Sequence, residues 1–445
     1  MISSENLAVR LGGIFTGDPA TITGFATDSR EVQPGDAFLA ISGARTDGHD
    51  HVHTAFANGA VVAIVEREIS GPHILVPNLV NALADLALSY RQEFKGPVIG
   101  ITGSAGKTTT KEFLAAALGP LGPILSTRGN RNTEFTAPLL WTEVSGETRV
   151  VVVEMAMRGF GQIAHLASFS RPTIGVITNV GYSHLLQVGS REGIAQAKAE
   201  LFNALPAEGI AVYPADDDFT AFLAEQAGSR RRLTFGFEPT ADAYISNYHS
   251  VGMSQFEITG HSLGQPFKTT LPVIGKHMAL NAASAILVAT QLGVPAQLAA
   301  DQLSGVLLPP MRMEIRDCHG VTVLIDTYNA SPASMIAALE ALSEQTVKGK
   351  RRAIIGEMKE LGNLTEQAHR MVASAIVRNE IDDVILVGDT AEIYADQLLH
   401  DGYPADRIHI SKSLTDLRKF MNSSQPGDMV LIKGSRALEL ERVLK

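Results

Sequence analysis

The sequence is poor in the residues that cross-link secreted proteins and in the runs that span membranes. Its 445 residues include one cysteine, Cys318, and one tryptophan, and aromatic residues make up 6% of the chain. A single cysteine excludes an internal disulfide, which fits a reducing compartment. No apolar run reaches the roughly 20 residues of a transmembrane helix, and the N-terminus lacks a basic start followed by an apolar core. We therefore expect a cytoplasmic protein without membrane insertion.

Dense basic segments are also absent. The formal net charge is −10, which argues against a nucleic-acid-binding surface and against attachment to an anionic membrane. With 45% hydrophobic residues, the chain is long enough for about three domains of roughly 150 residues each. We expect domains at 1–94, 95–311 and 312–445 and a monomeric chain.

Apolar runs that alternate with helical stretches predict an α/β fold. The first domain is predicted to be a small α/β unit with strands at 36–41 and 61–65 and a helix at 52–58. The second is predicted to hold a parallel sheet covered by helices on both faces, followed by an added antiparallel sheet, because its strand patterns change from continuous to alternating; the strands are expected at 98–102, 150–153, 174–177, 244–248 and 256–259. Beyond the plausible linker Pro309-Pro310, a Rossmann-like C-terminal domain is predicted, with strands at 321–326, 353–356, 383–388 and 429–433.

A glycine-rich turn follows the first strand of the second domain. The turn ends in Gly106-Lys107-Thr108, and a helical pattern continues from it. Glycines let backbone N–H groups close around phosphate oxygens, Lys107 supplies a positive charge, and Thr108 offers a hydroxyl to Mg²⁺. The strict P-loop pattern fails, because its first glycine would fall on Ile101. The segment predicts a nucleotide phosphate site, and a plain strand-to-helix turn is the alternative.

Three further side chains belong to the same predicted sheet edge. Glu154 ends one strand and His184 follows the next, and ligands gather at the carboxyl ends of parallel strands. A carboxylate there can bind Mg²⁺, whereas His184 taken alone is more often a hydrogen-bonded loop histidine. Lys198 lies in a helical stretch among apolar neighbours and, taken alone, is predicted to be a snorkelling surface lysine.

Taken together, these motifs resemble the ATP-dependent Mur ligases over essentially the whole chain. The family's loop, Thr-Gly-x-x-Gly-Lys-Thr, matches 102–108 and accounts for the failed strict pattern. The resemblance implies an ADP-forming amide ligase of peptidoglycan precursor synthesis, which joins D-alanyl-D-alanine to UDP-N-acetylmuramoyl-tripeptide through an acyl-phosphate. A sister Mur enzyme, a folylpolyglutamate-type ligase and a P-loop ATPase that switches a partner protein are the alternatives.

The resemblance also implies the catalytic and metal-binding residues. Lys107, Glu154, His184 and Lys198 match catalytic positions, and Lys198 matches a lysine that the family carries as a CO₂-derived carbamate. Because a carbamate offers oxygen ligands where an ammonium repels a cation, two Mg²⁺ ions are implied. One would be held through Thr108 and Glu154, and the other through Glu154, His184 and carbamylated Lys198.

The implied nucleotide site comes from both larger domains. Asn281 lies in a helix expected from 275 to 289, although Met278 departs from the family's usual asparagine. Arg312 and Asp326 match residues that reach the phosphate and ribose of ATP. The full set of implied ATP-binding residues is Thr102, Gly103, Ser104, Ala105, Gly106, Lys107, Thr108, Thr109, Asn281, Arg312 and Asp326.

The implied substrate residues lie in all three domains. For the UDP-substrate they come from the motifs at 27–30 and 43–49 and from the Gly-Asn-x-Asn match at 129–132; they are Ser29, Arg30, Thr46, Asp47, Gly48, His49 and Asn132. For the dipeptide they are Tyr328, Asn329, Ser331, Glu357, Lys433 and Arg436, although on spacing alone Lys433 and Arg436 are equally a surface pair. A metal site at His49, His51 and His53 is disfavoured, because no cysteine or carboxylate pattern completes it.

Overall fold

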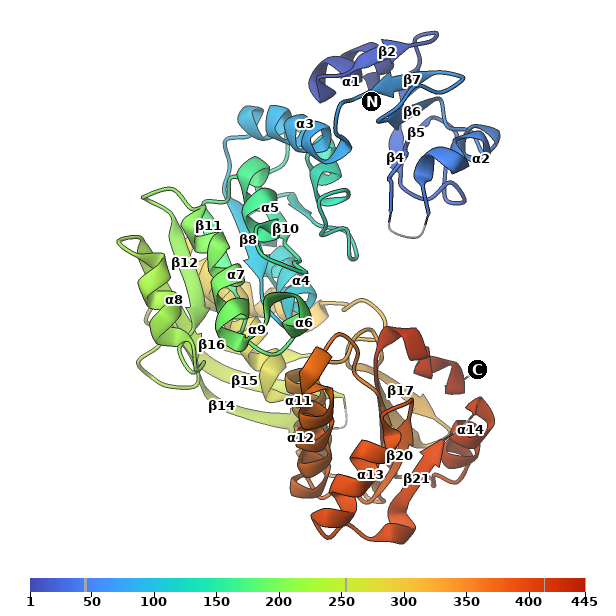
Figure 1. The fold of residues 1–445 in the computed structure, drawn as a ribbon. Helices are drawn as coiled ribbons and strands as arrows, with labels where there is room; N and C mark the ends of the chain where they lie inside the picture. Colours follow the sequence, from blue (N-terminus) through green and yellow to red (C-terminus); the bar gives the residue numbers. More distant parts are fainter. Residues whose placement is uncertain (44–45, 253, 412, 445) are drawn as a thin grey trace.

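The computed structural model describes residues 1–43, 46–252, 254–411 and 413–444. Figure 1 shows three globular parts in chain order, with the central part joined to one part at each end. Among the described residues, no helix is both long and apolar enough to cross a bilayer.

The N-terminal part is built on a five-stranded sheet in the order β2-β7-β6-β5-β4. The strands β5 and β6 are fully buried, as their apolar sequences require. The predicted strands and helix of this part are confirmed, with ends shifted by one or two residues. The elements are β1 (Ile2–Ser3), α1 (Ser4–Leu11), β2 (Ile14–Thr16), β3 (Thr21–Ile22), β4 (Gly24–Ala26), β5 (Asp36–Leu39), η1 (Gly48–His51), α2 (Val52–Ala57), β6 (Val62–Val65), β7 (His73–Leu75) and α3 (Leu79–Glu93).

The central part contains a nine-stranded sheet in the order β16-β15-β14-β13-β12-β11-β8-β10-β9. The strands from β8 to β13 are parallel, and helices cover both faces of this region. Its elements are β8 (Val98–Thr102), α4 (Lys107–Ala117), η2 (Gly119–Leu121), β9 (Ile124–Ser126), η3 (Ala137–Glu143), β10 (Val150–Glu154), α5 (Gln162–Ser170), β11 (Ile174–Ile177), α6 (Leu185–Val188), α7 (Arg191–Asn203), β12 (Ile210–Pro214), α8 (Thr220–Ala227), β13 (Arg231–Gly236), β14 (Ala243–Val251), β15 (Gln255–Ser262), β16 (Gln265–Leu271), α9 (Lys276–Gln291), α10 (Ala296–Asp301) and η4 (Gln302–Gly305).

The predicted antiparallel strands are present as β14, β15 and β16. They continue the parallel sheet, because β14 pairs with β13 through Phe235 and Gly236 before it turns antiparallel against β15. One apolar core therefore runs beneath both kinds of strand, with the long buried helix α9 packed along it.

The C-terminal part has a six-stranded sheet in the order β17-β18-β22-β19-β20-β21, parallel except for the edge strand β17. This arrangement confirms the predicted Rossmann-like strands. The elements are β17 (Glu314–Cys318), β18 (Val321–Asp326), α11 (Pro332–Ser343), β19 (Arg351–Gly356), η5 (Gly362–Leu364), α12 (Thr365–Arg378), β20 (Asp383–Val387), α13 (Ala391–His400), η6 (Ala405–Arg407), β21 (Ile408–Ser411), α14 (Leu414–Asn422), β22 (Met429–Lys433), η7 (Arg436–Leu438) and η8 (Leu440–Leu444).

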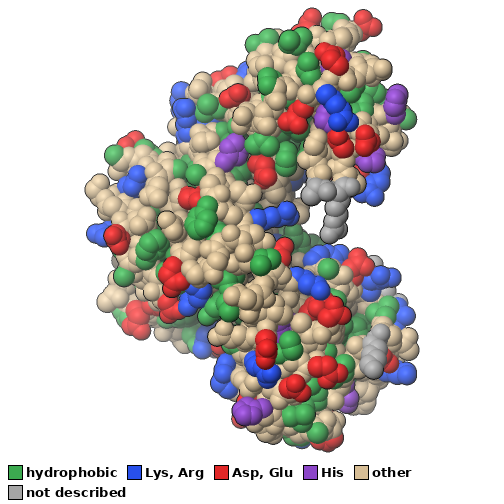
Figure 2. Space-filling view, viewed as in Figure 1, with side chains coloured by type: hydrophobic (Ala, Val, Ile, Leu, Met, Phe, Trp, Pro, Cys, Tyr) green, Lys and Arg blue, Asp and Glu red, His purple; other side chains and the backbone are tan. Residues whose placement is uncertain are grey.

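Both outer parts pack on the central one. At the N-terminal junction, Arg91 of α3 lies over the ring of Trp141 and donates to the backbone carbonyls of Ser170 and Arg171. At the other junction, α11 contacts α9, and one hydrophobic core includes residues of both parts. Figure 2 shows the molecular surface hollowed between the two outer parts.

Candidate functional site

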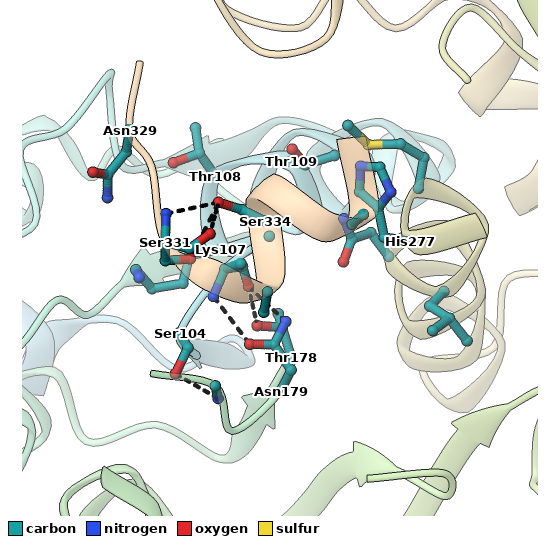
Figure 3. Close-up of a pocket in the computed structure, with 18 of the residues that line it drawn as sticks. Ser104, Lys107, Thr108, Thr109, Thr178, Asn179, His277, Asn329, Ser331 and Ser334 are labelled. Carbon is teal, nitrogen blue, oxygen red and sulfur yellow. Dashed lines mark hydrogen bonds between the residues drawn. The ribbon is translucent and has the colours of Figure 1, made fainter. Parts of the chain in front are cut away.

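A cavity of about 500 Å³ lies between the central and C-terminal parts. Its walls come from the turn before α4, the loops after β10, β11 and β12, the start of α9, and the C-terminal segments around β18, α11 and β22. Parallel strands therefore present their carboxyl ends to it, as the sequence predicted. Figure 3 shows the phosphate turn facing the α11 side of the cavity.

The phosphate turn has the backbone shape that its glycines allow. Gly103 and Gly106 have φ values of +156° and +79°, and a Cβ on Gly103 would lie 1.8 Å from Oγ1 of Thr178. Asn179 fixes the turn by accepting from the Ala105 amide at 3.0 Å through Oδ1. The first turn of α4 has no side-chain cap, so its N–H groups are available to an anion.

Lys107 lies at the start of α4 and lines the cavity. Its ammonium donates to the Gly103 carbonyl at 2.7 Å. Burial lowers its pKa, whereas Glu154 acts in the opposite direction. Thr108 and Thr109 line the cavity beside it, so the turn presents a charge, hydroxyls and amides to one space.

Glu154 ends β10 and is almost completely buried. Oε1 accepts from the Asn132 side-chain amide at 2.7 Å, and the Glu154 amide donates to Oγ1 of Thr127 at 3.0 Å. Within the part of the chain that the structure describes, Oε2 is buried without a hydrogen-bond partner. Such an atom is costly unless something binds it, so this carboxylate fits a cation ligand.

Lys198 is 1% exposed, so the interpretation of this residue as a surface lysine is wrong. The apolar neighbours on α7 face the core on several sides, and the helix has no solvent face at this position. Among the described residues, none forms a hydrogen bond or ion pair with its amine. Burial, followed by repulsion from Lys107, holds the pKa of Lys198 well below its ordinary value, which favours the neutral amine.

His184 stands at the start of α6 with a φ of +65° and lines the cavity. Its Nδ1 lies 3.1 Å from Oε2 of Glu360, a residue of the C-terminal part that also has a positive φ. Burial and the nearby Lys107 lower the pKa of His184 to about 4. The ring is therefore neutral at pH 7, the state in which imidazole binds metal ions.

The C-terminal part contributes Arg312 and Asp326 to the cavity. The Arg312 guanidinium stacks 4.0 Å from the centre of the Tyr328 ring, and its Nε is buried with no acceptor among the described residues. Asp326 accepts from the Met313 amide and from the buried ammonium of Lys433. Lys433 is thus an internal ion-pair partner, and the interpretation of it as half of a surface pair is wrong.

The other predicted dipeptide residues are distributed over this face. Asn329 and Ser331 line the cavity, and Ser331 begins α11 through a reciprocal hydrogen bond with Ser334. Glu357 is buried beside Lys359 and does not line the cavity. Arg436 lies half-exposed in an ion pair with Glu441. Asn281, by contrast, lies in the cavity wall with its side chain against Gly106.

The predicted N-terminal residues lie outside the cavity. Arg30 is exposed and paired with Asp28, and the backbone carbonyl of the buried Ser29 accepts from Asn58. Thr46, Asp47 and Gly48 follow positions 44 and 45 of their motif, which fall outside the described residues.

The histidine cluster near them has a structural explanation at His49. Its Nδ1 contacts Oδ1 of Asp47 at 2.7 Å, and its Nε2 accepts from the Glu66 amide at 3.1 Å. Both ring nitrogens are therefore used. Over 1–43, 46–252, 254–411 and 413–444, no three His, Cys, Asp or Glu side chains form a ready-made metal site.

Sequence reasoning missed part of the cavity wall. Asp216, Asp217, Phe235 and His277 all line it. The two aspartates lie in the loop after β12, so the strand-end rule that selected Glu154 could have found them. Burial lowers the pKa of His277 to about 4, which no sequence pattern indicates.

Three family models match consecutive segments of the chain: "Mur ligase family, catalytic domain" at 21–91, "Mur ligase middle domain" at 101–289 and "Mur ligase, glutamate ligase domain" at 311–436. Together these models cover more than half of the chain, so its fold is that of the Mur ligase family.

Individual relatives indicate which kind of Mur ligase the chain resembles. The chain is 35% identical to the UDP-N-acetylmuramoyl-tripeptide–D-alanyl-D-alanine ligase of Bacillus subtilis, with 96% of this chain and 93% of that protein covered. A crystal structure of MurF from Acinetobacter baumannii is similar with a TM-score of 0.89 and 30% identity, covering 99% and 97% of the two chains. MurF from Thermotoga maritima in complex with ADP is similar with a TM-score of 0.82 and 33% identity, covering 94% and 96%. The chain therefore belongs to the Mur ligase family, in its branch of UDP-N-acetylmuramoyl-tripeptide–D-alanyl-D-alanine ligases.

Proposed function

We propose that this chain uses ATP to join D-alanyl-D-alanine to UDP-N-acetylmuramoyl-tripeptide, in cytoplasmic peptidoglycan precursor synthesis. The observation that carries the proposal is one cavity that combines a phosphate turn with the buried, half-unpartnered carboxylate of Glu154. The identity of the two substrates is inferred from the branch of the family to which the chain belongs. We also propose domain boundaries near residues 94 and 311.

The residues around the phosphate turn fit divalent cations. Glu154 has an oxygen without a partner, and the His184 ring is neutral at pH 7. We propose that Thr108 and Glu154 hold one Mg²⁺, and that Glu154, His184 and Lys198 hold a second. Bound there, Mg²⁺ would screen the repulsion between the γ-phosphate and a substrate carboxylate.

Lys198 would take part as a carbamate. Its amine is buried, without a hydrogen-bond acceptor among the described residues, and its pKa is lowered. A neutral amine can attack CO₂, forming an N–C bond and releasing one proton, and the product carries a carboxylate-like group. That reaction would convert a buried base into an anionic ligand, which could bind the second Mg²⁺ together with Glu154 and His184.

The chain's own residues then position two displacement steps. The terminal carboxylate of the tripeptide attacks the γ-phosphorus, the bond to the β-phosphate oxygen breaks, and ADP leaves. The dipeptide amine attacks the resulting acyl-phosphate carbon, forms the C–N bond and loses a proton, and phosphate leaves. Lys107 and the free amides of α4 would stabilise the phosphate charge. The C-terminal wall would exclude water that hydrolyses the acyl-phosphate.

The two substrates would enter from opposite sides. We propose that Ser29, Arg30 and the 46–49 segment of the N-terminal part hold the UDP group. The guanidinium of the exposed Arg30 suits a pyrophosphate. Asn132 would lie next to the reacting carboxylate, because it already contacts Glu154. Tyr328, Asn329 and Ser331 would line the dipeptide side. Glu357 and Arg436 would act there only through the segments to which they belong.

Phosphate release measured with all substrate combinations tests the proposal. An amide ligase releases stoichiometric phosphate only when ATP, the UDP-tripeptide and D-alanyl-D-alanine are all present. Release with ATP and a partner protein alone would favour a P-loop ATPase, and product with glutamate and a folate would favour the folylpolyglutamate type. A panel that varies the third peptide residue and the dipeptide would separate sister Mur enzymes. For the carbamate, Lys198→Ala should lose activity and recover part of it with a small carboxylic acid.

A further inference from the structure

Arg191 connects three segments that meet beside the proposed metal site. It is the first residue of α7, and its side chain is 27% exposed. Its guanidinium lies 4.9 Å from the centre of the Tyr182 ring and 5.1 Å from that of Phe219. One nitrogen pairs with Asp218 at 2.8 Å, and another donates to the Val180 carbonyl at 3.2 Å.

The loop after β11 needs such a support. It carries His184, a non-glycine residue with a positive φ of 65°, a conformation that persists only where the surroundings enforce it. The loop is tied to the phosphate turn, because the Gly181 amide donates to Oγ of Ser104 at 2.8 Å. On its other side, the Val180 amide donates to Asp217 at 2.9 Å. Both backbone polar groups of Val180 are therefore held, its carbonyl by Arg191 and its amide by the loop after β12.

The same arginine also sets the position of α7. Lys198 follows Arg191 by seven residues, which is two helical turns and places the two residues on the same side of the helix. A contact that fixes the first residue of α7 to the loop after β11 thus fixes the position of Lys198 relative to His184. The guanidinium reaches that loop through two contacts, with the Val180 carbonyl and with the Tyr182 ring.

We propose that Arg191 is a positioning residue, which keeps His184 and Lys198 directed at one point. The inference rests on the proposed function, because it concerns the two side chains proposed to hold one Mg²⁺. Arg191 itself does not line the cavity. Its planar group contacts two aromatic rings while making two polar contacts, which a lysine ammonium cannot reproduce.

Arg191→Lys and Arg191→Met test this role. Residues that orient metal ligands typically contribute 10- to 100-fold to metal affinity or activity. We expect kcat to fall about 10-fold in Arg191→Lys and about 100-fold in Arg191→Met. The KM for ATP should stay within about 2-fold, since the phosphate turn is held by Thr178 and Asn179 at the start of this loop, whereas Arg191 contacts the later residues Val180 and Tyr182. A second readout is Mn²⁺ binding with ADP present, followed by electron paramagnetic resonance, in which the dissociation constant should rise about 10-fold or more in Arg191→Met.

Arg230 provides the matched control. It also donates to backbone carbonyls, those of Leu205, Asn203 and Ala227, and these acceptors lie outside the loop after β11. Arg230→Met should lower thermal stability without changing Mn²⁺ affinity. If Arg191→Met and Arg230→Met match in Mn²⁺ affinity and in kcat, Arg191 is structural and the inference is wrong. Should Arg191→Met not fold, Arg191→Lys decides by the same two measurements. A wild-type chain that forms no amide product would overturn the proposed function instead.

Discussion

Two lysines of the central part are equally buried but have opposite surroundings, and this contrast makes a sharp prediction. Lys111 and Lys198 are each 1% exposed. The Lys111 ammonium donates to the Thr127 carbonyl at 2.6 Å and pairs with Glu112 at 2.9 Å, whereas no described residue pairs with Lys198. Replacement by methionine removes the charge and leaves an unbranched side chain that is one atom shorter. We expect Lys198→Met to stabilise the central part and Lys111→Met to destabilise it.

The magnitudes follow from these contacts. Loss of Lys111 leaves the Thr127 carbonyl without its buried donor, which costs about 1–3 kcal/mol. For Lys198 the effect depends on pH. Because burial holds its pKa well below 10.5, the unfolded chain binds the proton more readily than the folded chain. The loss of stability caused by protonating Lys198 is therefore complete below the pKa that this residue has in the folded chain, and it is absent above 10.5. Between these limits wild-type stability should rise by up to about 1.4 kcal/mol per pH unit, a dependence that Lys198→Met lacks.

Urea unfolding followed by tryptophan fluorescence is the appropriate assay. Trp141 is the only tryptophan in the sequence and is fully buried in the central part, so its signal reports the domain that holds both lysines. The measurements are made between pH 7 and 10 in CO₂-free buffer without Mg²⁺, so that the amine stays unmodified. The advantage of Lys198→Met over wild type should shrink as the pH rises. A difference that is independent of pH, or a Lys198→Met chain less stable than wild type at pH 7, would refute the reasoning.

Three other perturbations test the site. Glu154→Ala removes the carboxylate with the unpartnered oxygen and should lower the ligation rate by at least about 100-fold, with an unchanged calorimetric Kd for the UDP-tripeptide; a parallel loss of that affinity would contradict the placement of the two sites. Asp326→Asn leaves the buried ammonium of Lys433 without its charged partner and should destabilise the C-terminal part by about 3 kcal/mol, measured by circular dichroism in urea; an unchanged midpoint would argue against this ion pair. Burial lowers the pKa of His277 from 6.5 to about 4. As the pH drops through this window, the unfolded chain takes up the proton first, so the stability of the folded chain falls. His277→Gln should flatten that part of the curve of melting temperature against pH, and an equally steep curve in the variant would exclude a buried neutral ring.

Much of the fold follows from local pattern. The continuous apolar run of β10 and the alternating run of β15 each predict the correct kind of strand, because burial on two faces or on one face sets the periodicity. The joining of β14 to β13 could not be predicted. It depends on one short parallel pairing at residues 235–236, and such a non-local contact leaves no periodic signal.

The same division holds at the site. Gly106-Lys107-Thr108 and Glu154 could be placed from sequence, since a strand end and a helix start fix where their side chains go. Lys198 could not be placed from its own neighbours, because an apolar context fits both a snorkelling and a buried lysine, and only the packing of α7 decides. The contact of Glu360 with His184 could not be predicted, since it spans 176 positions of the chain.

That long-range contact gives the C-terminal part a chemical connection to the phosphate site. The carboxylate of Glu360 can only accept, so a neutral His184 ring must carry its proton on Nδ1. The other ring nitrogen then has a free lone pair, the form in which a histidine binds a metal ion while its second nitrogen is oriented by a carboxylate. Because Glu360 and His184 belong to different parts, this tautomer is selected only when the C-terminal part lies against the central one. The position of the C-terminal part and the tautomer of the proposed metal ligand are therefore coupled through this contact.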